Sequence, residues 1–433
     1  MRIGIDGYNL AMPAGTGVAT YGAALARTIM TGAHKAVGVF GLAIDDESAM
    51  REVNFFDLLG RVEDQRKTQR QHRRERRGRL RRALGPRPRL HAVDIPLTER
   101  VDKGSFAELF PRFDRLTNCS DLFGIAHRHF EIYGRFATLR MPDPPDVMHW
   151  TYPLPVTLAG ARNIYTLHDL VPLRLPHTTL DVKKTYAAIV ATCVRDAAHL
   201  CTVSEASRRD ILERFPTDPA RITNCYQASP MPPGALTEPA EADARVIDGV
   251  FGLPARGYFL FFGAIEPKKN VGRLLEAYLA LQTPTPLVII GARAWQSENE
   301  LRLLAQAGGR VGRVVQLDYL PRALLLKMIR SARAVVFPSL YEGFGLPVLE
   351  AMQLGTPVLT SCLGSLPEVA GDAALLVDPY DAGSIAKALA RLDGDDDLRE
   401  RLGAAGLAQA ALFSQERYLS RLDAMYARTM EGA

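Results

Sequence analysis

Short apolar runs alternate with amphipathic segments along most of the chain. The apolar runs are rich in Val, Ile, Leu and Phe, which is typical of strands that are buried on both faces. Amphipathic helices are predicted between them, including 18–29, 180–196 and 205–215. The alternation favours an α/β protein with parallel sheets. Strands are predicted at residues 3–6, 36–42, 146–150, 163–167, 199–203 and 222–226 in the first half, and at 258–262, 287–290, 314–317, 334–338, 357–360 and 374–377 in the second half.

The chain is too long for one ordinary hydrophobic core. Two domains are expected for 433 residues, and a stretch rich in Pro, Ala and Gly at 230–256 is typical of a linker. We therefore predict a first doubly wound domain over residues 1–235, a second over 236–413 and a terminal helix over 414–433. Residues 45–140 interrupt the alternation with a basic and then a polar, aromatic stretch, so they are predicted to form an irregular insertion that is helical where it is ordered.

The segment 337–372 is the most informative part of the chain. The apolar run 334–337 that leads into it predicts a buried strand. Glycines at 343 and 345 then permit a tight turn with close backbone approach, and Pro347 suits the first turn of a helix. A strand, a glycine turn and a helix N-terminus form an anion site, because free N–H groups and the helix dipole point at one spot.

Glu342 and Glu350 flank this predicted anion site, one before the turn and one about a turn into the helix. Carboxylates beside a bound anion would repel it, so these two are expected to accept hydrogen bonds from hydroxyl groups. An anion flanked by two hydroxyl-rich groups describes a nucleoside diphosphate sugar.

The segment resembles the donor-binding signature of retaining glycosyltransferases with the GT-B fold, specifically glycosyltransferase family 4. The downstream run Gly364-Ser365-Leu366-Pro367-Glu368 belongs to the same likeness, which extends weakly over most of the chain outside 45–140. The resemblance implies two facing Rossmann-like domains with the active site in the cleft between them. It also implies that the terminal helix crosses back to the first domain, and that a hexosyl group passes from a nucleotide sugar to a hydroxyl with retention at the anomeric carbon.

Two lysines leave the predicted strand 258–262 in the run Glu266-Pro267-Lys268-Lys269-Asn270, where they can face the diphosphate. The run resembles the E-P-R-K-N motif of the family. Lys268 stands where Arg is commoner, which weakens the phosphate grip if a bidentate fork matters there. The resemblance assigns catalytic roles to His168, Lys269 and Glu342, and donor binding to Lys268, Gly343, Phe344, Gly345, Leu346 and Glu350.

His168 and Asp169 follow the predicted strand 163–167, at the strand end where α/β sheets place ligands. The His-Asp-Leu run resembles that of mannosyltransferase-like members, in which the histidine lies by the sugar at the reaction centre. His168 is expected to act as a hydrogen-bond partner, and Asp169 to orient the loop or reach the acceptor. Ser204 is predicted to cap the helix 205–215.

A glycine loop, Gly15-Thr16-Gly17, connects the first predicted strand and helix. Thr20 occupies the third glycine position of a dinucleotide fingerprint, so that fingerprint is incomplete. The resemblance implies instead that this loop borders the acceptor and the donor phosphates across the cleft.

No paired Asp-x-Asp stands where a metal-dependent transferase would need it. Residues 393–397 contain that spacing, but they are interpreted as a solvated acidic turn between helices. Lysines and a helix dipole can replace a metal in stabilising the leaving diphosphate, so neither a metal nor a cofactor is expected beside the nucleotide-sugar co-substrate.

The net charge of +5 conceals an arginine-rich block at residues 66–89, in which only Glu75 opposes the basic side chains. Such a block can be a solvated surface, or it can bind an anionic membrane surface or nucleic acid. Nucleic acid is least favoured because no stacking aromatics are interleaved with the arginines.

No apolar run approaches the roughly 18 residues that span a bilayer, and no signal peptide opens the chain. A cytoplasmic protein is expected, with peripheral attachment to the inner face of the plasma membrane as an option. Five scattered cysteines are predicted to be buried free thiols in a reducing cytosol.

The most specific prediction is a mannosyltransferase that uses GDP-mannose. The His-Asp-Leu and Glu-Pro-Lys-Lys-Asn variants resemble bacterial mannosyltransferases of surface-polysaccharide assembly, which implies a glycan or polyprenyl-diphosphate-linked acceptor. Three alternatives stay open: a UDP-sugar-dependent transferase of the same fold, a nucleotide-sugar epimerase, and an arginine-rich nucleic-acid binder.

Overall fold

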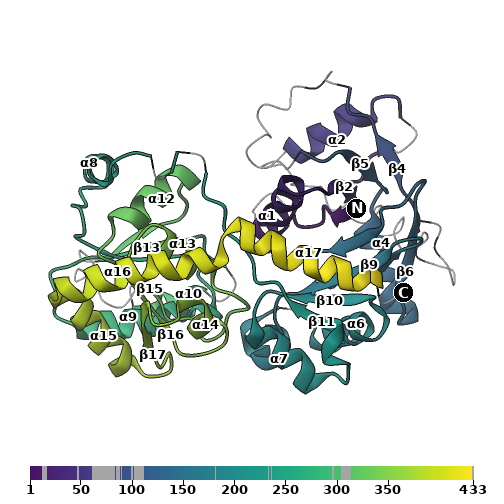
Figure 1. The fold of residues 1–433 in the computed structure, drawn as a ribbon. Helices are drawn as coiled ribbons and strands as arrows, with labels where there is room; N and C mark the ends of the chain where they lie inside the picture. Colours follow the sequence, from purple (N-terminus) through teal and green to yellow (C-terminus); the bar gives the residue numbers. More distant parts are fainter. Residues whose placement is uncertain are drawn as a thin grey trace.

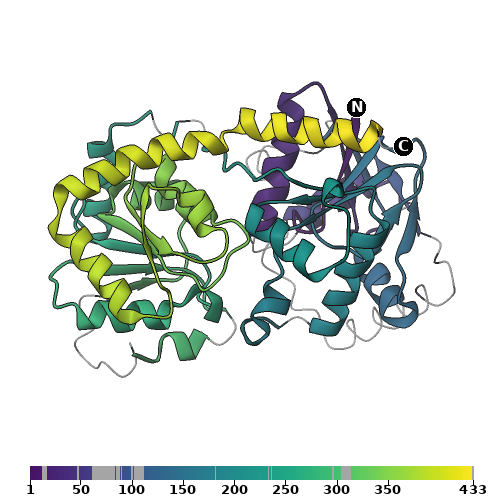
Figure 2. The ribbon, with the colours of Figure 1, turned by 60° about the horizontal axis from the view of Figure 1, so that its bottom comes forward.

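Two α/β domains, bridged by a long C-terminal helix, make up the computed structural model (Figure 1). Each domain has a mostly parallel sheet between helices (Figures 1 and 2). The residues described by the structure are 1–11, 17–45, 48–60, 83, 88, 90–98, 101, 112–180, 182–232, 234–235, 237–294, 297–303 and 314–431.

The first domain is built on an eight-stranded sheet in the order β11-β10-β9-β7-β1-β2-β5-β4, in which only the β4–β5 pair is antiparallel. Its central strands are buried because helices cover both faces. The strands are β1 (Arg2–Asp6), β2 (Lys35–Phe40), β4 (Val93–Ile95), β5 (Arg115–Asn118), β7 (Val147–Trp150), β9 (Arg162–Leu167), β10 (His199–Thr202) and β11 (Ile222–Asn224). A small three-stranded sheet joins β3 (Leu90–His91), β6 (Ala137–Arg140) and β8 (Val156–Leu158). The helices are α1 (Gly17–Thr31), α2 (Arg51–Gly60), α4 (Leu122–Tyr133), α5 (Val171–Arg174), α6 (Lys183–Asp196) and α7 (Glu205–Arg214).

The second domain is built on a six-stranded sheet in the order β14-β13-β12-β15-β16-β17, with every pair parallel. The strands are β12 (Phe259–Phe262), β13 (Leu287–Ile290), β14 (Val314–Leu317), β15 (Ala334–Phe337), β16 (Val358–Ser361) and β17 (Ala374–Val377). The helices are α8 (Ala240–Phe251), α9 (Val271–Ala280), α10 (Ser297–Glu300), α12 (Arg322–Ser331), α13 (Leu346–Gln353), α14 (Leu366–Ala370), α15 (Ala382–Gly394) and α16 (Asp396–Ala410). Single 3₁₀ turns lie at Pro176–Thr178, Pro219–Arg221, Pro267–Lys269 and Ala411–Phe413.

Helix α17 (Gln415–Glu431) leaves the second domain and lies along the first, where it packs beside α1 (Figures 1 and 2). Its buried side chains recur at helical spacing and form one apolar face, so the helix is held by packing. They are Tyr418, Leu422, Met425, Tyr426 and Thr429. Two polar contacts add to this: the Tyr426 hydroxyl lies 2.7 Å from His149 Nδ1, and Asp423 Oδ1 lies 2.9 Å from His34 Nε2.

Residues 45–140 differ from the expected irregular, helical insertion. Their described part contains α2 and α4 but also four strands, and β5 pairs with β2 in the main sheet. These strands span two to four residues each, too short to give a clear period-2 pattern in the sequence. The arginine-rich block 66–89 lies outside the described residues except for Ala83 and Pro88.

Candidate active site between the two domains

The glycine turn after β15 forms the centre of the candidate site. β15 ends at Phe337, and α13 begins at Leu346 with Pro347 in its first turn, as the sequence predicts. Gly345 has φ of 110°, a left-handed conformation that a side chain would strain. The Ser365 hydroxyl lies within hydrogen-bond distance of the carbonyl oxygens of Glu342 and Phe344, at 2.9 and 2.7 Å, and fixes the turn.

Glu342 is buried and faces both predicted lysines. Lys269 Nζ donates to Glu342 Oε1 at 2.6 Å and also lies 5.0 Å from the centre of the Phe337 ring. Burial raises the pKa of Glu342, but the charges of Lys269 and Lys268 outweigh it and hold that pKa below its usual value. The carboxylate is therefore ionised at neutral pH.

Lys268 lies in the same negative environment as Lys269. Its ammonium lies 3.4 Å from Glu266 Oε1. Burial lowers the pKa of Lys268, but Glu342, Glu266 and Asp169 together raise it above its ordinary value. Both lysines leave the end of β12 through the 3₁₀ turn Pro267–Lys269, so the two positive charges reach the Gly343 turn from one segment.

Glu350 is also buried, one turn into α13, and only 4% of the residue is exposed. Its Oε1 accepts from Arg322 at 2.8 Å and from the Ser229 hydroxyl at 3.1 Å. Sequence reasoning did not identify these two partners. The sequence gives a weak indication for Arg322. It is the first residue of α12, and a cation is disfavoured at a helix N-terminus unless a carboxylate elsewhere holds it.

His168 follows β9 and belongs to the opposite domain. Its Nε2–H donates to the carbonyl of Thr151 at 2.8 Å, and the edge of Tyr21 packs on the ring at 4.7 Å between centres. Burial lowers the pKa of His168, so the ring is neutral at pH 7 and Nδ1 carries the lone pair. The buried Asp6 accepts from the amide of Thr151 and so supports the residue that orients this histidine.

Asp169 orients its own loop, which is one of the two roles expected for it. Its Oδ1 accepts from the amide of Val171 at 2.9 Å, and its carbonyl accepts from the Tyr186 hydroxyl at 2.9 Å. Ser204 likewise caps α7 as predicted, by accepting from the amide of Ser207 at 3.0 Å.

The structure brings the loops of the two domains into contact. A β-carbon placed on Gly343 would lie 2.5 Å from the carbonyl oxygen of His168 and 3.1 Å from Asp169 Oδ2. A β-carbon on Gly17 would lie 4.0 Å from Leu346 Cδ1. His168, Asp169 and Gly17 therefore meet the Gly343–Leu346 turn, whereas Gly15 and Thr16 of the same predicted loop lie outside the described residues.

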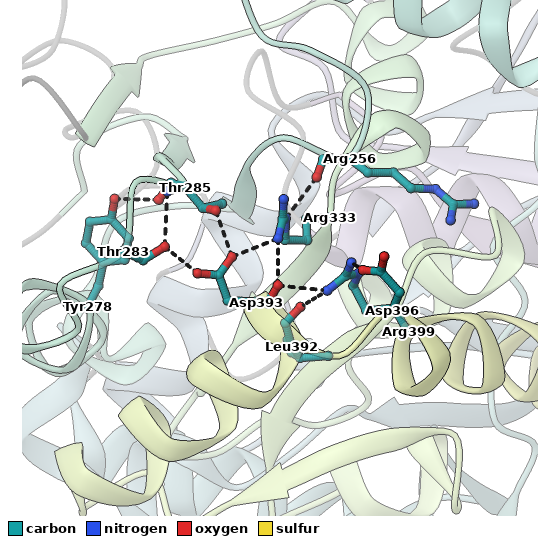
Figure 3. Close-up of polar contacts among 9 residues, drawn as sticks. All are labelled: Arg256, Tyr278, Thr283, Thr285, Arg333, Leu392, Asp393, Asp396 and Arg399. Atoms are coloured by element: carbon teal, nitrogen blue, oxygen red, sulfur yellow. Dashed lines mark hydrogen bonds and ion pairs between the residues drawn. The ribbon is translucent and has the colours of Figure 1, made fainter.

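The acidic run 393–397 joins α15 to α16 and is exposed at 394–397, as the sequence predicted, but Asp393 is partly buried. Figure 3 shows Asp393 at the centre of a polar network in the second domain. Its carboxylate accepts from the hydroxyls of Thr283 and Thr285 and from Arg333, the last at 2.8 Å, while Arg399 donates to its carbonyl at 3.0 Å. Asp393 thus fixes the end of α15, a structural role that depends on partners remote in sequence.

Metal-ligand clusters and membrane-spanning helices are both lacking in the ranges that the structure describes. Within those ranges no group of three or more His, Cys, Asp or Glu side chains is arranged to hold a metal ion. Nor does any helix there have the length and apolarity to cross a membrane. The five cysteines are unpaired, and Cys362 alone is exposed.

Comparison with known proteins decides the family. A family model described as glycosyl transferases group 1 matches residues 251–409. O-antigen chain mannosyltransferase B from Escherichia coli is 38% identical over 262 residues, which are 59% of this chain and 67% of that protein. The chain belongs to the group 1 glycosyltransferases. The serotype-specific mannosyltransferase WbdA from Escherichia coli is 28% identical over 67% of this chain, which spans only 38% of WbdA.

The fold of this glycosyltransferase is GT-B. Sucrose-phosphate synthase from Thermosynechococcus elongatus superimposes with a TM-score of 0.66 over 100% of both chains at 17% identity. The predictions of a GT-B fold and of a glycosyltransferase are confirmed. The roles of the individual site residues stay predictions, now attached to a defined geometry.

Proposed function

We propose that this glycosyltransferase moves a mannosyl group from GDP-mannose to a hydroxyl of a glycan or polyprenyl-diphosphate-linked glycan, with retention at the anomeric carbon. One observation carries the proposal: the buried Glu342–Lys269 pair, with Lys268 beside it, lies at the glycine turn that begins α13 and touches the His168 loop. Positive charge and free amides at a helix N-terminus suit a diphosphate, and ionised buried carboxylates suit hydroxyl groups.

The donor would be held mostly by the second domain. Lys268, Lys269 and the amides of 343–346 would bind the diphosphate, and an ammonium with three donors can serve Glu342 and a phosphate together. Glu342 would accept from hydroxyls of the sugar, and Glu350 from those of the ribose. This arrangement would supply charge stabilisation without a metal or a further cofactor.

In the proposed reaction, the bond between the anomeric carbon and the phosphate oxygen breaks while the acceptor oxygen bonds to the same face of that carbon. The electron pair of the broken bond leaves with the diphosphate, and the proton of the acceptor hydroxyl passes to the departing phosphate. Lys268, Lys269 and the turn amides would stabilise the developing negative charge. His168, neutral and fixed by Thr151, would position the sugar from the opposite domain.

The choice of mannose and of a surface-polysaccharide acceptor rests on the relatives. O-antigen chain mannosyltransferase B and WbdA are both named as mannosyltransferases. The first experiment identifies the base of the donor.

The test is a calorimetric titration of the purified protein with GDP, UDP, ADP and dTDP in the absence of metal ions. GDP should bind with a Kd on the order of micromolar, and Lys269→Ala should abolish the binding, because it removes one charge from the diphosphate site. Replacing the exposed Lys387 of α15 by Ala is the matched control and should leave the Kd unchanged. Preference for UDP would replace GDP by UDP in the proposal, and binding of none of the four would overturn the donor site.

We also propose that residues 66–89 attach the enzyme peripherally to an anionic membrane surface, since each engaged Lys or Arg adds on the order of 1 kcal/mol. In flotation with vesicles of phosphatidylcholine and phosphatidylglycerol, the intact protein should rise with the vesicles and a variant lacking residues 66–89 should stay behind. Vesicles of phosphatidylcholine alone are the control and should carry neither. Equal flotation of both proteins would remove the arginines from the proposal.

A further inference from the structure

Helix α7 of the first domain has an N-terminal cap that the second domain completes. Glu368, in α14 of the second domain, accepts from two successive amides of α7: Oε2 from Glu205 N–H at 2.9 Å and Oε1 from Ala206 N–H at 3.0 Å. The amide of the next residue, Ser207, is satisfied within the first domain by the Ser204 hydroxyl at 3.0 Å. The first three N–H groups of a helix have no partner within the helix, so the cap of α7 is complete only when both domains contribute.

Ser207 and Asp210 of α7 contact the chain on both sides of Glu342. The Ser207 hydroxyl donates to the carbonyl of His168 at 2.6 Å and lies 3.3 Å from the carbonyl oxygen of Gly343. About one turn later, Asp210 accepts from the hydroxyl of Tyr341. Tyr341 and Gly343 are the immediate neighbours of Glu342 in the chain. One helix therefore contacts the loop of the proposed sugar-binding carboxylate and the loop of His168 together.

The cap contact is a charge-assisted link between the two domains. A carboxylate that accepts two backbone N–H groups makes charge-assisted hydrogen bonds and also lies at the positive end of the helix dipole. Tyr226, with its hydroxyl 3.4 Å from Glu368 Oε2, encloses the group further. Withdrawing Glu368 would leave two helix amides and one carboxylate without these partners, so the contact favours one arrangement of the two domains.

We propose that Glu368 is a positioning residue for glycosyl transfer: by completing the cap of α7 it sets the Tyr341–Gly343 segment, and with it Glu342, against the loop of His168. This inference rests on the proposed function, in which Glu342 and His168 hold the same sugar from opposite sides. It makes a separate prediction, because all of the residues proposed to hold the nucleotide belong to the second domain. In the part of the chain that the structure describes, the Glu368 carboxylate forms its hydrogen bonds with Glu205, Ala206 and Tyr226 of the first domain.

The test compares the full-length protein with Glu368→Gln. Glutamine keeps the size of the side chain, but it has a single acceptor oxygen, whereas each of the two amides needs one. Its NH₂ group would face the other N–H, and two donors cannot form a hydrogen bond. The measurements are the Kd for GDP by calorimetry, initial rates with GDP-mannose and the synthetic probe acceptor octyl α-mannoside, and the radius of gyration of the unliganded protein by X-ray scattering. The matched control is Glu400→Gln, an exposed glutamate of α16.

For Glu368→Gln we expect a Kd for GDP within about twofold of the wild type, a kcat at least about tenfold lower, and a larger radius of gyration. Glu368→Asp keeps the charge on a shorter side chain and should retain more of the kcat. Ser207→Ala, which removes the hydroxyl between the two loops, should lower kcat in the same direction while leaving the helix cap at Glu368 in place. Glu400→Gln should match the wild type in all three measurements.

An unchanged radius of gyration in Glu368→Gln would overturn the positioning role, and so would an unchanged kcat. A parallel loss of GDP affinity and kcat would also overturn it, since that pattern describes a merely structural residue. Failure of the wild type to bind GDP would count against the proposed donor alone, because the scattering comparison needs no nucleotide and decides the positioning role by itself.

Discussion

At Glu342, one buried carboxylate faces two ammonium groups. Lys269 donates to it at 2.6 Å, and the charge of Lys268 adds to the field that keeps it ionised. The lysines therefore have two tasks: they neutralise a buried carboxylate in the fold, and their remaining N–H groups are available to a phosphate in the proposed reaction. A variant of Lys269 should change stability as well as nucleotide binding, and the two effects can be separated.

Lys269→Ala should lower the free energy of unfolding at pH 7 by about 3 kcal/mol, because it leaves a buried carboxylate short of its partner. It should also raise the pKa of Glu342, since Lys269 is the strongest of the groups that lower it. In the wild type the lowered pKa contributes stability that is fully present above the unfolded-state pKa of about 4.3 and is lost as the pH falls through the folded-state pKa. Denaturant unfolding at pH 7 and pH 4 measures both effects, and the variant should lose less stability between these pH values than the wild type.

The double variant Glu342→Gln with Lys269→Met is the control for that prediction. It removes the charge and its partner together, so it should recover much of the lost stability while GDP binding stays abolished. If Lys269→Ala unfolds with wild-type free energy at pH 7, the ion pair contributes nothing to the fold and its geometry has to be explained by binding alone.

At the scale of elements, the sequence predicted the second domain better than the first. The predicted strands 287–290, 314–317 and 374–377 coincide with β13, β14 and β17, because continuous apolar runs mark parallel strands that are covered on both faces. In the first domain five strands were missed: β3, β4, β5, β6 and β8. Each spans only two to four residues, and β6 alternates buried and exposed residues over only four positions.

Only some of the side-chain contacts in the candidate site could be predicted from the sequence. Lys269 and Glu342 could be expected to share a site, since each follows a strand and parallel strands end at one edge of a sheet. Arg322 beside Glu350, and Ser207 between the His168 and Gly343 loops, could not be predicted, because a hydrogen bond between remote side chains leaves no local pattern. Glu368 lies 163 residues from the amide that it caps, so only the tertiary structure reveals that pairing.

At the scale of the whole molecule, α17 connects the second domain to the interior of the first. The hydroxyl of Tyr426 lies 2.7 Å from His149 Nδ1, and His149 Nε2 lies 2.7 Å from the hydroxyl of Thr166. Thr166 lies 2.9 Å from the Tyr21 hydroxyl, and the ring of Tyr21 packs edge-on against His168. A continuous series of contacts therefore joins the terminal helix to the histidine of the candidate site.

Tyr426→Phe tests whether the polar part of this connection stabilises the protein. The ring and its packing are kept, but a buried nitrogen of His149 loses its partner, so the free energy of unfolding should fall by about 1–2 kcal/mol. Denaturant unfolding at pH 7 measures this change. Tyr380→Phe is the matched control, since Tyr380 is 53% exposed and loss of its hydroxyl should change the free energy by less than about 0.5 kcal/mol. Equal values for the two variants would mean that α17 is held by its apolar face alone, and the contacts that lead to His168 would then carry no energetic link from the terminal helix.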